Sequence, residues 1–260
     1  METAQNYRIN AIWAGIFFVI ATAFLFVGEA LYKPALTDPN VLTAAAAAEN
    51  DIALGVLIEF ACVLAIPLIA IALYPVLRLV SASLAVGYVA FRLFEAAVFF
   101  EMEIDRLLVL AISRAYVASP TGGTDQIDLL IQTLMGGEAW SGTTGPLYNI
   151  VFVIGMVMLN WMLWGSRLVP RWISGWGLAS AATLGGLAIA VLFLEVPTAL
   201  AVTLIAPLAV QEMVLALRFI FKGFDQAALQ RLAEVTWPET PSSPANLGDQ
   251  GPVLAGLPRR

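Results

Sequence analysis

The chain has 260 residues, of which 60% are hydrophobic and 12% charged, against roughly 25% charged residues in soluble proteins, so its composition is that of a membrane protein. Its net charge of -6 excludes the basic surface that nucleic-acid binding requires, so nucleic acid is not an expected partner. The lack of histidine and the single cysteine, Cys62, exclude an internal disulfide and any metal or haem site that needs a histidine pair or a cysteine cluster. A metal held by carboxylates alone stays open, but we assign no metal ligands and predict no cofactor.

Six apolar runs are long enough to cross a hydrocarbon core of roughly 30 Å, which takes about 20 helical residues. Each must be a helix, because lipid tolerates only helices and closed barrels, and no strand-like alternation is present. The six runs are 10–32, 52–76, 84–112, 147–168, 173–194 and 198–221. We therefore predict an all-α integral membrane bundle of six transmembrane helices, forming one domain over residues 1–224.

Two connections between the spans carry helical patterns of their own. Asp38 and Pro39 are suited to the N-cap and first position of a short helix over 41–49. Thr124 or Asp125 can cap a second one, whose apolar residues recur at helical spacing. These apolar residues are Ile127, Leu130, Ile131 and Leu134. We expect both to be short amphipathic helices on the outer face of the membrane.

The distribution of lysine and arginine predicts the orientation of the bundle. Outside the tail, six of these residues fall on the side of the termini and three on the other side. They are Arg8, Arg78, Arg167, Arg171, Arg218 and Lys222 against Lys33, Arg106 and Arg114. The positive-inside rule then places both termini in the cytoplasm. Residues 225–260 form a cytoplasmic tail, in which a helix can extend over 226–235 and the Pro/Gly/Ser-rich remainder is expected to be disordered.

The third span carries charges in a run otherwise suited to lipid. Arg92, Glu95, Glu103 and Arg106 fall within roughly 80° of arc at 100° per residue, so they form one polar stripe. At a rise of about 1.5 Å per residue, Glu95 lies near the middle of the membrane and Arg92 nearly one turn towards the cytoplasm.

Polar residues of the other spans fall at matching depths. Glu212 in the sixth span lies near the level of Arg92, and Glu59 in the second span near that of Glu103. The fourth span places Asn149 at the outer level and Asn160 at the inner one. The candidate intramembrane polar cluster is therefore Arg92, Glu95, Glu212, Glu59, Glu103, Asn160 and Asn149.

These groups should face the interior and pair, because a charge at the centre of a span costs at least about 2.5–3.5 kcal/mol. We expect Arg92 to pair with Glu95 and Glu212, with Glu59 and Glu103 above them. Because carboxylates outnumber the buried arginine in this scheme, either one or more is protonated or water reaches them. Two interpretations stay open: a structural clamp between helices, or a substrate, ion or proton site.

Several short motifs follow one another along the chain. They are Tyr7 to Ile9, Ala14 to Ile16, an acidic residue in span two before Ala72 to Arg78, Phe91 to Glu95, Arg167 to Arg171 before Gly175 and Gly177, Gln211-Glu212 and Lys222-Gly223. Together they resemble a bacterial membrane family, known as domain of unknown function 4386. The resemblance covers residues 7–224 and implies a six-helix bundle in the bacterial inner membrane with an unassigned activity. Relatives often carry a histidine near span four, where this chain has Tyr148 and Asn149, so no role that needs imidazole carries over.

Three functions are compatible with the sequence. The first is a non-enzymatic membrane component that binds a lipid or a protein partner. The second is a small-molecule or proton-coupled transporter, with Arg92 binding an anionic group and a glutamate exchanging protons. The third and least favoured is an intramembrane enzyme, for which only carboxylate acid/base chemistry survives the absence of histidine, and we assign no catalytic residue. The expected partners are the lipid bilayer and a small ligand or lipid at the interior cluster, and the sequence names no protein partner.

Overall fold

The computed structural model describes residues 2–118, 126–127, 129–131, 133–134 and 145–236, and within these ranges it contains helices and no strand. Six of the helices are long and apolar enough to cross a membrane, which confirms the predicted number of spans. The spanning helices are α1 (Glu2–Leu36), α3 (Glu49–Val80), α4 (Ala82–Ala118), α6 (Pro146–Ser166), α7 (Arg171–Ala190) and α8 (Thr198–Phe221). α3 and α8 continue without interruption across Pro67 and Pro207.

The six spanning helices form a ring in which each packs against two neighbours. α3 packs between α1 and α4, α6 lies between α4 and α7, and α8 closes the ring between α7 and α1. The largest core cluster accordingly draws residues from several helices, with Phe18, Leu73, Tyr88, Leu163 and Phe219 among its buried members. A side chain that points to the axis of this ring is therefore removed from lipid.

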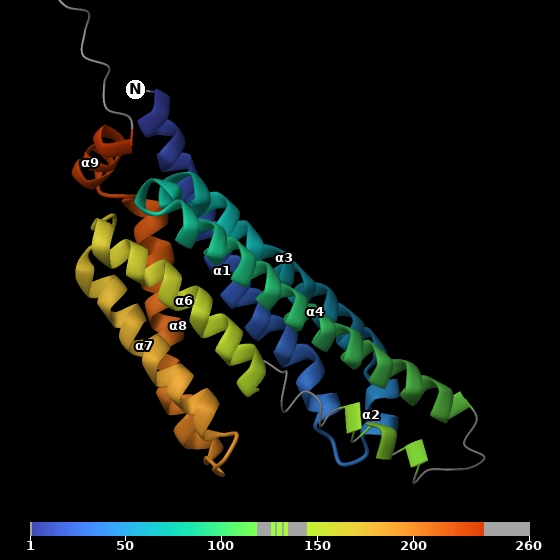
Figure 1. Cartoon of the computed structure of the whole chain (residues 1–260). Helices are drawn as coiled ribbons and strands as arrows, with labels where there is room; N and C mark the ends of the chain where they lie inside the picture. The colour runs from blue at the N-terminus through green and yellow to red at the C-terminus, as the bar shows by residue number, and fades with distance from the viewer. Residues whose placement is uncertain (1, 119–125, 128, 132, 135–144, 237–260) are drawn as a thin grey trace, which may run out of the picture.

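The helices differ in length, and this gives the bundle two unlike ends. α1, α3 and α4 have 35, 32 and 37 residues, whereas α6, α7 and α8 have 20 to 24. Only the shorter set matches a span of about 20 residues. The longer helices continue past the others at the end opposite the N-terminus (Figure 1). We call the end that holds the start of α1 the proximal end, and the opposite end the distal end.

The distal extension is covered by short helical pieces. α2 (Val41–Ala47) packs Leu42 and Ala45 against the ends of α1, α3 and α4. The described residues of 126–134 are helical and bury Ile131 in the same cluster. The predicted N-cap of α2, Asp38, is wrong, because the N-cap is Asn40. Asp38 instead accepts a hydrogen bond from the backbone N–H of Asn40 at 2.7 Å. Thr124 and Asp125 lie outside the described residues.

The proximal end is closed by contacts between distant parts of the chain. The guanidinium of Arg8 donates to the carbonyl oxygens of Phe219, Ile220 and Phe221 at 2.7, 2.6 and 3.1 Å, so α1 satisfies the free carbonyl groups at the end of α8. α9 (Gln226–Thr236) follows and buries Ala228 and Leu229 against the bundle. The first part of the predicted tail therefore packs as a helix, and residues 237–260 lie outside the described part of the chain.

Candidate functional site

α4 carries two charged clusters, one towards each end of the bundle. The distal cluster consists of Tyr32, Glu59, Glu103 and Arg106, all buried. The proximal cluster consists of the buried Arg92 and Glu95 and the partly exposed Tyr148 and Glu212. The four charged residues from α4 are each 4% exposed or less, because they share the helix face that points into the ring. Both clusters thus depend on one polar stripe along a single helix.

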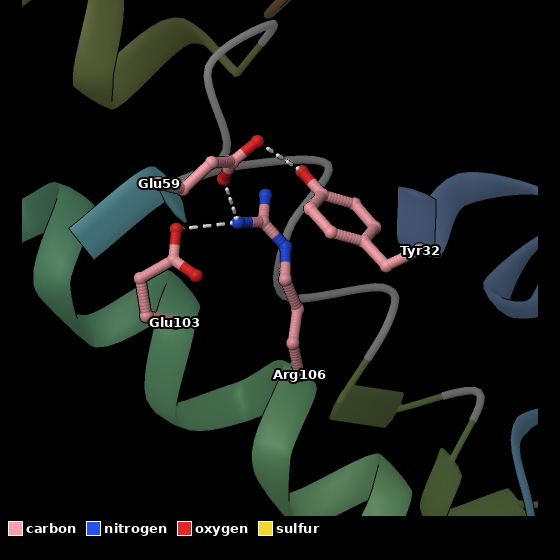
Figure 2. A network of polar contacts seen from close by, with 4 residues as sticks. All are labelled: Tyr32, Glu59, Glu103 and Arg106. Carbon is pink, nitrogen blue, oxygen red and sulfur yellow. Dashed lines mark hydrogen bonds and ion pairs between the residues drawn. The ribbon is translucent and has the colours of Figure 1, made fainter. Parts of the chain in front are cut away.

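Arg106 is the centre of the distal cluster (Figure 2). Its Nη1 atom donates to Glu59 Oε2 at 2.5 Å and to Glu103 Oε1 at 2.6 Å. The Tyr32 hydroxyl donates to the other oxygen of Glu59 at 2.8 Å, and the Tyr32 ring lies 4.4 Å from the guanidinium carbon. Because Tyr32 belongs to α1 and Glu59 to α3, the cluster ties three helices together.

Two glycines make room for this cluster. A Cβ atom at Gly28 of α1 would collide with Cγ of Glu59, and one at Gly55 of α3 would lie 3.0 Å from the ring of Tyr32. The backbones of α1 and α3 therefore approach closely where their polar side chains meet. Small residues permit the same close approach between membrane helices in general.

The proximal cluster is built around Arg92. Its Nη1 atom lies 2.8 Å from Glu95 Oε2, and its Nε donates to the carbonyl oxygen of Ile66 at 3.5 Å. Tyr148 of α6 donates its hydroxyl to Glu95 Oε1 at 3.1 Å, and the Phe152 ring lies 5.8 Å from the guanidinium carbon. This cluster therefore joins α4 to α3 and α6.

An apolar layer separates the two clusters. Phe99 and Met102 occupy the interior face of α4 between Glu95 and Glu103, and they pack with Cys62, Val63, Ile66 and Ala96. The eight residues from Glu95 to Glu103 correspond to about 12 Å of helix. The clusters are thus two separate polar sites and not one continuous network.

A small cavity adjoins the proximal cluster near the axis of the ring. It is lined from four helices, among others by Phe18 of α1, Tyr88 and Arg92 of α4, Asn160 of α6, and Gln211 and Glu212 of α8. The space open to the centre of a water-sized sphere is about 10 Å³. A cavity of this size accommodates about one water molecule.

The structure brings together some of the predicted pairs and not others. Arg92 pairs with Glu95, whereas Glu212 interacts electrostatically with Arg92 but forms no ion pair within 4.0 Å among the described residues. Glu59 and Glu103 come together, as expected, but they do so through Arg106, which forms an ion pair with each of them. Asn160 lines the cavity, and Asn149 donates to the carbonyl oxygen of Gly145 at 2.8 Å.

Sequence reasoning missed four members of these sites, namely Arg106, Tyr32, Tyr148 and Gln211. The expectation of a single buried arginine is wrong, because Arg106 is 4% exposed. Its position on the polar stripe beside Glu103 indicated that Arg106 faces the interior. We instead counted Arg106 with the charges that set the orientation of the bundle, and so did not assign it to the cluster. The tyrosines and the glutamine gave no comparable signal, because their roles depend on how α1, α6 and α8 pack.

Comparison with known proteins identifies the family. The model of a family described as domain of unknown function 4386 matches residues 13–223, which is most of the chain. The chain belongs to this family. The match to the domain of unknown function 4386 includes all the charged residues of both clusters. No curated protein and no solved structure matches the chain. The family description itself names no activity.

Proposed function

We propose that this protein is a non-enzymatic component of the bacterial inner membrane that binds an anionic phospholipid on the surface between α1 and α3. The orientation that we propose has both termini in the cytoplasm. It is supported by the arginines and lysine at the proximal end, which include Arg8, Arg78, Arg167, Arg171 and Lys222.

One observation carries the lipid proposal, a groove on the outside of the ring. Its α1 wall is Asn10, Trp13 and Phe17, and its α3 wall is Leu68, Ile71 and Ala72. The groove has a volume of about 320 Å³. It lies between two spanning helices on the outside of the bundle, where we expect lipid. Such a space suits part of an acyl chain, since the walls are almost entirely apolar.

The walls of the groove are held in place by specific contacts. The indole of Trp13 stacks on Phe17 with ring centroids 5.7 Å apart, and the amide of Asn10 donates to the carbonyl oxygen of Ala72 at 2.8 Å. The single polar side chain that lines the groove is thus engaged with backbone, and the remaining surface is apolar. A preformed groove of this kind lowers the ordering cost of binding.

A cation stands where the headgroup of that lipid would lie. Arg78 follows Ile71 by seven residues on α3, which places it on the same helix face and about 10 Å nearer the proximal end. Its side chain is exposed. An arginine at headgroup level attracts anionic lipid by about 1 kcal/mol. An acyl chain in the groove and a phosphate on Arg78 therefore suit one anionic phospholipid.

Native mass spectrometry of the purified full chain with phosphatidylglycerol tests this proposal. We expect Arg78→Gln to weaken binding about fivefold, which corresponds to about 1 kcal/mol. Ala72→Phe should fill the groove and reduce binding further, and phosphatidylcholine should bind more weakly than phosphatidylglycerol.

Two matched variants serve as controls. Arg231→Gln removes an exposed arginine of α9, and Ala53→Phe adds the same ring to an exposed position of α3 away from the groove. Both should bind phosphatidylglycerol as the wild type does. If all four variants bind alike, the groove between α1 and α3 does not hold the lipid and the proposal fails.

A further inference from the structure

The cavity beside Arg92 combines buried oxygen atoms without partners and a surplus of negative charge. Asn160 and Gln211 both line it, and each is 1% exposed. The amide nitrogen of Asn160 donates to the carbonyl oxygen of Met156 at 3.0 Å, and that of Gln211 to Ile173 at 3.2 Å. These bonds fix the amide orientations, and neither side-chain oxygen has a hydrogen-bond partner among the described residues. A buried unpaired acceptor costs about 1–3 kcal/mol.

The charges around the cavity do not balance. Arg92 is matched by Glu95 at 2.8 Å, which leaves the carboxylate of Glu212 without a cation of its own. The charged and titratable groups that face Glu212 are Tyr88, Arg92 and Glu95, all from α4. The lining residues from α1 and α6 are uncharged. With every carboxylate ionised, the proximal cluster therefore carries one net negative charge.

We propose that this cavity binds one small monovalent cation, H⁺ or Na⁺, at the carboxylate of Glu212. The groups left unmatched there are oxygens and a negative charge, which select a cation over an anion. The space admits a particle the size of one water molecule, so an organic cation does not fit. A sodium ion would be bound by oxygens of Glu212 and Gln211, whereas a proton would reside on Glu212 with a water molecule donating to the amide oxygen of Gln211. The amide oxygen of Asn160 lies against Gly177 of α7, so we assign it no contact with the ion.

This inference does not rest on the proposed lipid function, because the groove lies on the outside of the ring and the cavity inside it. The ligand of the proximal cluster is then a small cation. The distal cluster has no such role, because both of its carboxylates already contact Arg106.

The test measures the melting temperature of the purified full chain against Na⁺, with choline replacing Na⁺ at constant ionic strength, over a series of pH values. A sodium site predicts a saturable rise, on the order of 5 °C at a hundredfold excess over Kd. Competition by protons at the same carboxylate would raise the apparent Kd for Na⁺ about tenfold for each unit that the pH falls. A proton-only site predicts a melting temperature that rises as the pH falls and does not respond to Na⁺.

Glu212→Gln should abolish whichever dependence the wild type shows, since the amide carries no charge to bind. Glu234→Gln, at an exposed position of α9, should leave that dependence unchanged. Gln211→Met, which removes one oxygen and keeps the volume, should raise the half-saturating Na⁺ concentration or shift the pH midpoint. If Glu212→Gln does not fold, Glu212→Asp should keep the dependence with a displaced midpoint.

Either of two results overturns the proposal. One is a wild-type melting temperature that responds neither to Na⁺ nor to pH. The other is a folded Glu212→Gln or Glu212→Asp variant whose response to Na⁺ and pH is identical to that of the wild type. Lipid binding by the same preparations should be unaffected, so failure here is distinguishable from failure of the lipid proposal.

Discussion

Replacing Arg106 with methionine should destabilise the bundle more than any other change of a charged side chain in α4. Arg106 Nη1 contacts the carboxylates of both Glu59 and Glu103, and these side chains are 0% and 3% exposed. The substitution leaves two buried carboxylates without a cation and removes the contact with the ring of Tyr32. Removing one partner of a buried ion pair costs about 3–5 kcal/mol. We expect a loss in that range in the free energy of unfolding.

The chain offers a matched control on the same helix. Arg114 also pairs with a carboxylate of α3, Glu49, at 3.0 Å, but the side chains are 60% and 43% exposed. Exposed pairs contribute about 0–1 kcal/mol, so Arg114→Met should change little. The triple variant Glu59→Leu, Glu103→Leu, Arg106→Met removes all three charges and should recover most of the lost stability.

The assay is reversible unfolding of the purified protein in mixed micelles with a rising fraction of sodium dodecyl sulfate, followed by circular dichroism. Extrapolation to zero denaturing detergent gives the free energy of unfolding for each variant. If Arg106→Met and Arg114→Met both cost less than about 1 kcal/mol, the distal cluster does not hold the helices together. A triple variant less stable than Arg106→Met would equally contradict the electrostatic explanation.

Three further outcomes are expected from the packing. Gly28→Ala should cost about 1–3 kcal/mol of unfolding free energy, because its Cβ collides with the side chain of Glu59. Arg8→Gln should lower stability by about 2 kcal/mol in the same assay, because the carbonyl groups at the end of α8 lose a cation. A single cysteine at Ala96, in a Cys62→Ala background, should not react with a membrane-impermeant thiol reagent until the protein is unfolded, since Ala96 is 8% exposed within the apolar layer.

Each of these outcomes has its own comparison. Gly186→Ala meets no atom within 4 Å and should stabilise the helix by about 0.5–1 kcal/mol, so a similar loss at both glycines would contradict the steric argument. Arg231→Gln should leave stability unchanged, and an equal loss there would point to net charge instead of the contact with α8. A cysteine at Ala227, an exposed position of α9 outside the spans, should react in the folded protein. Labelling of Ala96→Cys from one side would instead show a water-filled path to the clusters.

The class of the protein and the number of its spans followed from the sequence alone. Apolar runs of sufficient length have one stable solution in lipid, the helix, whatever their neighbours are. The ends of the helices were harder to predict from the sequence. α4 continues to Ala118 although the apolar run ends near residue 112, because hydrogen bonding along a helix does not stop where hydropathy falls. The shared face of Arg92, Glu95, Glu103 and Arg106 also followed from helical geometry within one segment.

Which residues meet across helices was decided only by the tertiary structure. The depth estimates placed Glu212 level with Arg92, and both line one cavity, but among the described residues Arg92 forms its ion pair with Glu95 and not with Glu212. Tyr32 joins the distal cluster because glycines on α1 and α3 let those helices approach, and Gln211 joins the cavity because α8 closes the ring against α1. Such contacts depend on side chains from segments far apart in the chain, and the periodicity of one helix carries no information about the rotation of its neighbour.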